Sequence, residues 1–389
     1  MSTLAWFALG SLVVWVWLLL GQGFFWRTDQ RLPAAPRGGP DRWPRVVIVV
    51  PARDEAGVLP LSLPSLLAQD YPGVAEVILV DDGSTDGTGT LAVGLAGRYG
   101  GLPLTVVSPG EPEAGWTGKL WALRHGMALA RAREPEFLLL TDADIAHEPD
   151  SLRLLVAAAT ANGLDLVSQM ARLRVASFWE RLVVPAFVYF FAQLYPFRWI
   201  NRRRPLATAA AGGCVLLRTE TAVAAGVPEV IRQAVIDDVS LARAVRRAGG
   251  RIWLGLAERV DSVRPYQGLG ELWRMVARSA YAQLRHSPLL LAGTVAGLAV
   301  VYLVPPVALV AGGDAVAAWA GGVAWAVMAG TYGPMLRYYR QPLWLAPLLP
   351  FTAFLYLLMT VDSAVRHHRG RGAAWKGRTY ARPEATSGR

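Results

Sequence analysis

The stretch that decides the fold is VILVDDGSTD at residues 77–86, where an apolar run passes directly into carboxylates and small polar residues. Two adjacent carboxylates, Asp81 and Asp82, are costly at the end of an apolar strand unless they bind something polar. The Gly-Ser-Thr-Asp that follows makes a tight turn and a helix cap. A calcium loop would need alternating ligands and a closing Glu, and a dinucleotide-binding fold would need GxGxxG here. The stretch therefore predicts a strand that ends at a binding site of another kind.

The surrounding residues predict an α/β domain from Arg45 to about Pro265. Residues 46–50 and 76–80 are β-branched or apolar runs with a helical pattern at 62–69 between them, so they predict a strand, helix, parallel strand unit. Residues 137–140 and 165–169 predict two further strands. Because the carboxyl ends of parallel strands form the ligand crevice of such a sheet, polar residues at those ends should converge.

A second cluster, Pro51, Arg53, Asp54 and Glu55, follows the opening strand. An acidic side chain there can accept hydrogen bonds from a base or a ribose. The competing interpretation is a solvated loop in which Asp54 caps the next helix.

The third and fourth clusters are Asp142-Ala143-Asp144 and Asp237-Asp238. Two carboxylates one residue apart on an extended stretch can point to one side, where oxygen ligands suit Mg²⁺ or Mn²⁺ bridging a diphosphate. A surface turn is the alternative for the triplet, and a helix cap is the alternative for Asp237-Asp238. The pair becomes a candidate catalytic base because the other clusters define a site that needs one.

The composition places part of the chain in lipid. Apolar residues make up 53% of the 389 residues and charged residues 17%. The formal charge of +10 comes mostly from residues that flank apolar segments, so we expect membrane lipids and not nucleic acid as partners. The single cysteine, Cys214, excludes an internal disulfide and a metal-thiolate site.

The chain divides into five parts. We predict a transmembrane anchor at 1–26, preferred over a cleaved signal because bulky aromatic residues stand where cleavage needs small ones. A basic Pro/Gly-rich linker (27–44), a catalytic domain (45–287), membrane segments (288–362) and a basic tail (363–389) follow. The basic linker and tail predict a cytoplasmic catalytic domain on a bacterial inner membrane.

Two segments have competing interpretations. Residues 178–200 are strongly aromatic but contain Glu180, Arg181, Pro185 and Pro196, and they fit either an interfacial, acceptor-side segment or a buried helix. Residues 343–361 contain Pro347 and Pro350, and a full crossing would place the basic tail outside the cell. We therefore expect this segment to enter the membrane and return on the same side.

The four clusters, in this order and spacing, resemble the family 2 glycosyltransferases of the GT-A fold over residues 45–265. Three further strings resemble the ceramide-glucosyltransferase-like branch, and within it the hopene-associated subgroup: GWTGK at 115–119, GGC at 212–214 and WKGRTY at 375–380. Processive relatives carry Gln-x-x-Arg-Trp after the base, whereas residues 273–279 read WRMVARS. The resemblance therefore implies a single-transfer enzyme.

The resemblance also implies roles for individual residues. The nucleotide-sugar would contact Pro51, Arg53, Asp54, Glu55, Asp81, Asp82, Lys119 and Asp142. Asp142 and Asp144 would bind Mg²⁺ or Mn²⁺, and Asp238, with Asp237 beside it, would be the catalytic base. The acceptor, a membrane lipid or more narrowly a hopanoid, would contact Gly212, Gly213, Cys214 and Arg278.

Three alternatives remain open at this point. His147, close to the metal triplet, is a rival base. A processive polysaccharide synthase and a non-catalytic nucleotide-sugar-binding protein are rival functions. The sequence does not indicate the nucleotide, the sugar or the oligomeric state.

Overall fold

The computed structural model describes residues 1–389 except 35–38, 312, 371–373, 376–377 and 380–389. These residues separate into two compact units. Unit 1 comprises 1–29, 175–202 and 266–373, and unit 2 comprises 30–174, 203–265 and 374–389.

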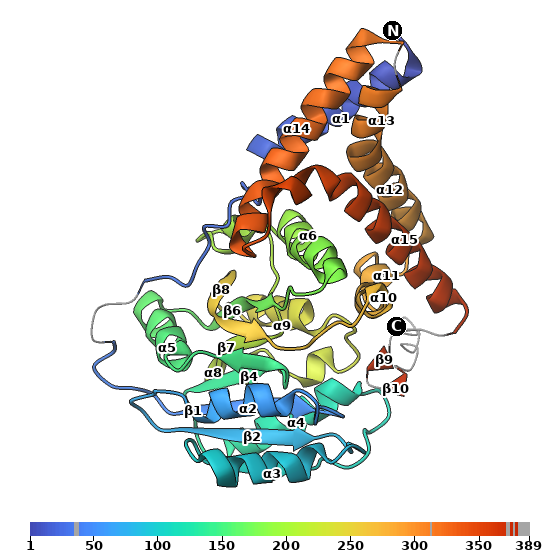
Figure 1. The fold of residues 1–389 in the computed structure, drawn as a ribbon. Coiled ribbons are helices and arrows are strands. Elements are labelled where there is room, and N and C mark those ends of the chain that lie inside the picture. Colours follow the sequence, from blue (N-terminus) through green and yellow to red (C-terminus); the bar gives the residue numbers. More distant parts are fainter. Residues whose placement is uncertain (35–38, 312, 371–373, 376–377, 380–389) are drawn as a thin grey trace, which may run out of the picture. The chain divides into compact units, whose positions relative to one another are not determined.

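Unit 2 contains a mixed sheet of eight strands (Figure 1) in the order β3-β2-β1-β4-β7-β6-β8-β5. Strands β1, β2, β3 and β4 are parallel to one another, β7 is antiparallel to β4 and β6, and β5 is antiparallel to β8. The strands are β1 (Val46–Ala52), β2 (Ala75–Asp81), β3 (Leu104–Val107), β4 (Phe137–Thr141), β5 (Ile145–His147), β6 (Leu166–Leu173), β7 (Cys214–Arg218) and β8 (Ile252–Ser262). The strands predicted at 46–50, 76–80, 137–140 and 165–169 are therefore confirmed, in a GT-A-like α/β fold.

Helices cover both faces of the sheet. The core on one face joins alternate residues of the strands to α2 (Leu59–Leu67), α3 (Thr88–Tyr99) and α5 (Ser151–Asn162). On the other face α4 (Gly118–Arg131) packs so closely that a Cβ on Gly126 would lie 2.4 Å from Val49 Cγ1. The remaining helical segments of unit 2 are α8 (Thr219–Ala224), η1 (Glu229–Ile231) and α9 (Asp237–Arg247).

Strand register aligns the segments that carry the polar clusters. Ala52 pairs with Asp81, and Val49 pairs with Leu140, so the ends of β1, β2 and β4 lie side by side. Cys214 pairs with Thr141 at the start of β7, which places Gly212 and Gly213 beside the end of β4. The predicted convergence of carboxyl ends follows from this alignment.

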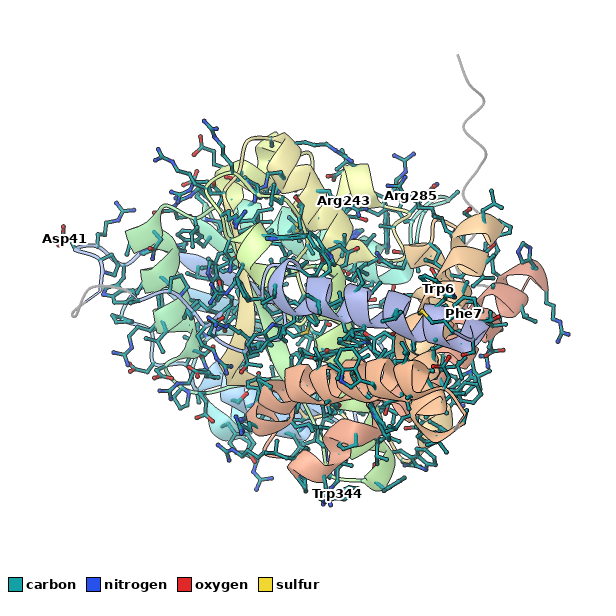
Figure 2. The ribbon with its side chains drawn as sticks, turned by 90° about the horizontal axis from the view of Figure 1, so that it is seen from above. Trp6, Phe7, Asp41, Arg243, Arg285 and Trp344 are labelled. Carbon is teal, nitrogen blue, oxygen red and sulfur yellow. The ribbon has the colours of Figure 1, made fainter. Side chains whose placement is uncertain are left out.

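The regular secondary structure of unit 1 is helical in all of its described residues. Four of its helical stretches are long and apolar enough to cross a membrane, counting only described residues. They are α1 (Thr3–Leu20), Pro288–Val310, α14 (Ala315–Tyr338) and Leu343–His368. The second is built from α12 (Pro288–Leu298), η2 (Ala299–Leu303) and α13 (Val304–Val310), and the fourth from η3 (Leu343–Leu348) and α15 (Leu349–His368). Helices α1 and α14 run side by side (Figure 1), and Trp6 and Phe7 of α1 and Trp344 of η3 are exposed on the outside of the unit (Figure 2).

The aromatic segment at 178–200 forms α6 (Phe178–Leu194) and α7 (Phe197–Ile200), most of whose apolar side chains are buried within unit 1. Glu180, at the polar start of this segment, is part of the helix cap. Glu180 is fully buried and accepts hydrogen bonds from the backbone N–H groups of Ala176, Ser177 and Tyr266, at 2.7–2.9 Å. Together with Ser177 it forms a capping box, so it begins the helix.

Contacts within unit 1 bring distant segment ends together. The Ser2 backbone N–H donates to Asp314 Oδ2 at 2.7 Å, at the turn before α14. The rings of His286 and His367, before α12 and at the end of α15, stack at 4.1 Å. Trp325 Nε1, near the middle of α14, donates to the Pro347 carbonyl at 3.0 Å. Two short helices, α10 (Leu269–Ala277) and α11 (Ala280–Gln283), complete the unit, and the backbone pairs β9 (Ala374–Trp375) with β10 (Arg378–Thr379) in unit 2.

Candidate active site

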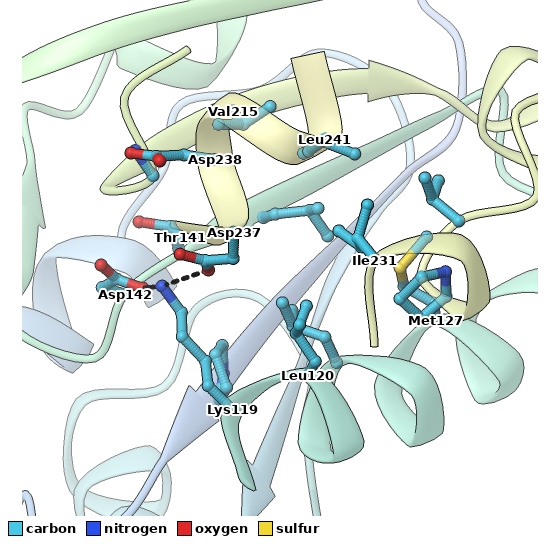
Figure 3. Close-up of a pocket in the computed structure, with 16 residues that line it drawn as sticks. Lys119, Leu120, Met127, Thr141, Asp142, Val215, Ile231, Asp237, Asp238 and Leu241 are labelled. Carbon is cyan, nitrogen blue, oxygen red and sulfur yellow. Dashed lines mark hydrogen bonds and ion pairs between the residues drawn. The ribbon is translucent and has the colours of Figure 1, made fainter. Parts of the chain in front are cut away.

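A pocket in unit 2 lies at the carboxyl ends of β1 and β4 (Figure 3). One end is charged and carries Lys119, Asp142, Asp237 and Asp238, and the rest is apolar. The apolar lining comes mainly from α4, η1 and α9: Leu120, Leu123, Met127, Val227, Ile231 and Leu241. The third and fourth polar clusters, 95 residues apart, therefore meet at one pocket.

Lys119 joins these two clusters. Its Nζ lies 2.8 Å from Asp142 Oδ1 and 3.0 Å from Asp237 Oδ2 (Figure 3). Burial alone lowers the pKa of Lys119, but Asp142 and Asp237 raise it above its ordinary value. The ammonium therefore stays charged and holds the end of β4 to the start of α9.

The pKa of Asp142 is shifted by opposing electrostatic effects. Burial raises its pKa, Lys119 lowers it, and the nearby carboxylate of Asp144 raises it again, so that the net shift is upward. The two carboxylates are therefore close enough to repel each other. A cation bound there would relieve that repulsion.

Asp238 lies in the first turn of α9, where the backbone holds its carboxylate. The N–H of Gly212 donates to its Oδ2 at 3.0 Å, and the N–H of Val239 donates to its Oδ1 at 2.7 Å. Burial and the charge of Asp237 raise the pKa of Asp238 to about 7. A Cβ at Gly212 would lie 3.4 Å from Asp238 Cβ, so the glycine keeps the space above this carboxylate open. Asp238 thus has the position and the proton affinity of a general base at neutral pH.

The first and second clusters are joined by hydrogen bonds between their loops. Asp54 accepts from the Thr85 N–H at 2.8 Å, and the Glu55 N–H donates to Thr88 Oγ1 at 2.8 Å. Arg53 donates to the Asp82 carbonyl and lies 3.7 Å from the buried Asp82 carboxylate. The interpretation of Asp54 as only a helix cap is wrong, because its carboxylate fastens the loop after β1 to the loop after β2.

Arg264 is a site residue that the sequence analysis missed. Its Nη2 lies 2.8 and 2.7 Å from the two carboxylate oxygens of Glu55, and its Nε lies 2.8 Å from Asp144 Oδ2. The Ser262 hydroxyl also donates to Asp144 Oδ2, at 3.3 Å. No local motif marks Arg264, because it reaches the site only through the pairing of β8 with β5.

Asp142 and Asp144 fit a magnesium or manganese ion that is bound together with a diphosphate. Among the described residues there is no group of three or more His, Cys, Asp or Glu side chains that would hold a metal ion alone. Mg²⁺ in phosphate-handling enzymes is commonly held by one or two carboxylates plus the phosphates of the substrate. The carboxylates of Asp142 and Asp144, which repel each other at the end of β4, suit that arrangement.

His147 lies in a different environment from Asp238. It is 3% exposed, its Nε2 lies 3.0 Å from Thr141 Oγ1, and its Nδ1 lies 3.3 Å from Ser151 Oγ. Burial lowers its pKa to about 4, so the ring is neutral at pH 7. Since both ring nitrogens are bonded inside the core and His147 does not line the pocket, the geometry disfavours it as a base.

The remaining predicted residues are placed as follows. Pro51 lines the pocket, and Asp81 accepts from the Ser84 N–H at 2.9 Å in its own turn. The Gly213 carbonyl accepts a hydrogen bond from Thr141 Oγ1 at 2.8 Å. Arg278 is exposed and belongs to unit 1, so its role at the acceptor stays a prediction.

The Cys214 side chain does not face the site, contrary to the expectation. It is fully buried in the core of unit 2, and burial raises the pKa of its thiol to about 12. The thiol therefore makes no contact with an acceptor. Of the string at 375–380, Lys376, Gly377 and Tyr380 lie outside the described residues.

The sheet, with carboxylate clusters at the ends of β1, β2 and β4, belongs to a GT-A-like fold. Residues 47–222 match the family "Glycosyl transferase family 2". The chain therefore contains a glycosyltransferase domain of family 2.

Parts of the chain are also similar to individual proteins and solved structures. A segment of 151 residues is 30% identical to the probable glycosyltransferase YdaM of Bacillus subtilis, covering 37% of this chain and about a third (34%) of that protein. The mannosyltransferase PcManGT of Pyrobaculum calidifontis, solved with GDP-Man and Mn²⁺, has a similar fold, with a TM-score of 0.50, 20% identity, and coverage of 94% of this chain and 98% of that one. S. aureus TarS 1-349, solved with UDP-GlcNAc, aligns with a TM-score of 0.41 and 14% identity over 84% of this chain and 92% of that one.

Proposed function

We propose that this protein is an inverting, metal-dependent glycosyltransferase that moves a sugar from a nucleotide-diphospho-sugar to a lipid hydroxyl at a membrane. The observation that carries the proposal is the cluster around Lys119, which joins the metal triplet at the end of β4 to the Asp237-Asp238 pair of α9. A metal-binding pair and a general base, held at one pocket, are the two parts that such a transfer needs.

The charge balance of the site supports a requirement for a metal ion. Five carboxylates face two cationic side chains. The carboxylates are Glu55, Asp142, Asp144, Asp237 and Asp238, and the cations are Lys119 and Arg264. An anionic diphosphate would be repelled by this excess of negative charge. Mg²⁺ or Mn²⁺, held by Asp142 and Asp144, would supply the positive charge that the leaving diphosphate needs.

Asp238 takes the proton of the acceptor hydroxyl. An alcohol is a poor nucleophile at neutral pH, so a carboxylate with a pKa near 7 is well matched to remove its proton as the new bond forms. The Gly212 N–H keeps the carboxylate oriented, while Lys119 holds the neighbouring Asp237. The hydroxyl then attacks the anomeric carbon in one displacement, which inverts its configuration.

The nucleotide is held at the ends of β1 and β2. Glu55 and Asp82 accept hydrogen bonds from the base and ribose, with Arg53 and Asp54 fixing the two loops to each other. Pro51 lines the pocket, Asp81 holds the turn after β2 by accepting from the Ser84 N–H, and Lys119 stands near the diphosphate. The hydrogen bonds between these loops support this assignment.

Nucleotide release tests the proposal. Purified full-length protein is mixed with Mn²⁺ or Mg²⁺, a membrane lipid extract, and each of several UDP- and GDP-sugars. We expect free nucleotide diphosphate to form with one donor and to disappear with excess chelator. The absence of release with every donor would favour the non-catalytic binding protein, whereas a product that carries a chain of added sugars would favour the processive synthase.

Three segments of unit 1 cross the membrane, and the fourth enters it and returns. This topology is supported by the proximity of Ser2 to Asp314 and of His286 to His367. Leu343–His368 follows α14, and its end lies beside the residues that precede α12. The Trp325 to Pro347 hydrogen bond favours a bend about 20 Å from the end of α14, at 1.5 Å per residue. The basic linker and tail then face the cytoplasm.

Cysteine labelling tests this topology in a Cys214→Ala background. Cysteines introduced at Ser2 and at His368 should respond differently to an impermeant reagent in intact cells. We expect labelling at position 2 and protection at position 368 until the membrane is permeabilised. Equal labelling at both positions would mean that Leu343–His368 crosses fully.

The acceptor is a membrane lipid, because the family 2 domain is connected to segments that contain long apolar helices through residues 29–30 and 265–266. The resemblance to the hopene-associated subgroup favours a hopanoid as that lipid. Lipid profiling of a deletion strain should show the loss of one glycolipid, and an unchanged lipid profile would contradict the lipid acceptor.

A further inference from the structure

Arg264 bonds to two carboxylates that the proposed function assigns to different ligands. In that function Glu55 contacts the nucleotide, and Asp144 binds the metal ion. One guanidinium spans both, with three contacts of 2.7–2.8 Å. Burial alone lowers the pKa of Arg264, but Asp144 and Glu55 raise it above its ordinary value, so it is always charged.

The local fold fixes Arg264 in this position. Strand β8 pairs antiparallel with β5, so that Ser262 lies opposite Ile145, and the Val263 N–H donates to the Asp144 carbonyl at 2.9 Å. The backbone that carries Arg264 is thus bonded to the backbone that carries Asp144. Glu55 approaches from β1, and its side chain is only 7% exposed in the salt bridge.

We propose that Arg264 is a positioning residue that couples nucleotide binding to metal binding. The inference rests on the proposed function, which makes Glu55 a nucleotide residue and Asp144 a metal residue. Arg264 orients Glu55 through Nη2, which contacts both oxygens of that carboxylate, and it neutralises Asp144 through Nε. A divalent ion at Asp144 competes with that Nε contact, whereas the nucleotide benefits from the orientation of Glu55.

This arrangement gives opposite signs for the two ligands when Arg264 is removed. Without the guanidinium, Asp144 loses a competing cation, so metal binding in the absence of nucleotide should become tighter. Glu55 loses its orienting partner, and the anionic nucleotide loses a nearby positive charge, so nucleotide binding should become weaker. General damage to the fold would weaken both.

The test measures binding by full-length protein in detergent. Mn²⁺ is titrated by electron paramagnetic resonance, and UDP or GDP, whichever the wild type binds, by calorimetry, each with and without the other ligand. In the wild type, Mn²⁺ should increase nucleotide affinity by the same factor by which nucleotide increases Mn²⁺ affinity. In Arg264→Gln we expect Mn²⁺ alone to bind roughly fivefold tighter and the nucleotide roughly fivefold weaker, a change at the lower end of typical couplings.

Two variants serve as controls. Arg264→Lys keeps the charge but not the fork, so Mn²⁺ affinity should stay near the wild-type value while nucleotide affinity falls. Arg172→Gln breaks a comparable salt bridge to Asp261 of β8, with contacts of 2.7 and 3.1 Å, and should leave both affinities unchanged.

The outcomes separate this inference from the proposed function. If the wild type binds Mn²⁺ and nucleotide but Arg264→Gln loses affinity for both, or for neither, the coupling role of Arg264 is wrong and the proposed function stands. If the wild type binds neither ligand, the proposed function fails, and the role of Arg264 fails with it.

Discussion

Two polar clusters meet at the end of β4, one around Lys119 and one around His147. In the first, carboxylates and an ammonium face a pocket and shift one another's pKa values. In the second, Thr141, His147 and Ser151 are neutral, buried and bonded to one another. The difference distinguishes a reactive site from a structural one. Charged groups that are not balanced and line a pocket can bind ligands, whereas neutral groups that are hydrogen-bonded to one another stabilise the strand that carries the charged groups.

The largest expected effect comes from removing the metal side of the Lys119 cluster. Asp144→Ala should abolish transfer, because the leaving diphosphate loses the carboxylate that helps hold its counter-ion. The circular dichroism spectrum should stay unchanged, which separates loss of function from unfolding. Full activity in this variant, or in excess chelator, would remove the metal assignment.

The pH dependence of transfer gives the next largest effect. Asp238 must be deprotonated to act, and its pKa is raised to about 7, so kcat/KM should rise about tenfold per unit below pH 7 and level off above it. The sign for stability is opposite: the folded protein binds this proton more tightly than the unfolded chain, so the contribution present below pH 4 is lost as pH rises through 7. A rate that is flat from pH 5 to 8 would contradict the role of Asp238.

The sequence predicted the parts of the site that lie in short local patterns. Apolar runs followed by Asp81-Asp82 and by Asp142-Ala143-Asp144 mark strand ends, and parallel strands bring such ends together. Lys119 was assigned to the diphosphate by resemblance, but its salt bridge to Asp237 depends on the packing of α4 and α9. The sequence therefore predicted the residues of the Lys119 cluster but not the contacts between them.

Other features depend on long-range pairing or side-chain direction and were missed. Arg264 reaches Asp144 across 120 residues and Glu55 across 209. Cys214 follows two site glycines, but as the first residue of β7 it points into the core. The three backbone donors that bond to the buried Glu180 are not visible in a linear sequence.

The smallest effect on transfer is expected from the supporting cluster. His147→Ala removes a buried network member and should lower the free energy of unfolding by roughly 1–3 kcal/mol. Transfer at a temperature where the variant is folded should change only a few-fold. His125→Ala is the matched control, because this partly exposed ring has its Nδ1 3.3 Å from the Trp121 carbonyl and should cost less stability. Equal stability of the two variants would contradict a supporting role for His147.

The central claim is that the Lys119 cluster, through Asp238, performs the chemistry while the His147 cluster does not. The direct measurement compares transfer rates and donor affinities of Asp238→Asn and His147→Gln with those of the wild type. Asp238→Asn keeps the shape but removes the basicity, so transfer should fall by roughly 10²- to 10⁴-fold with little change in donor affinity, while His147→Gln stays near the native rate. Near-native transfer by Asp238→Asn, together with loss of transfer in folded His147→Gln, would contradict the account.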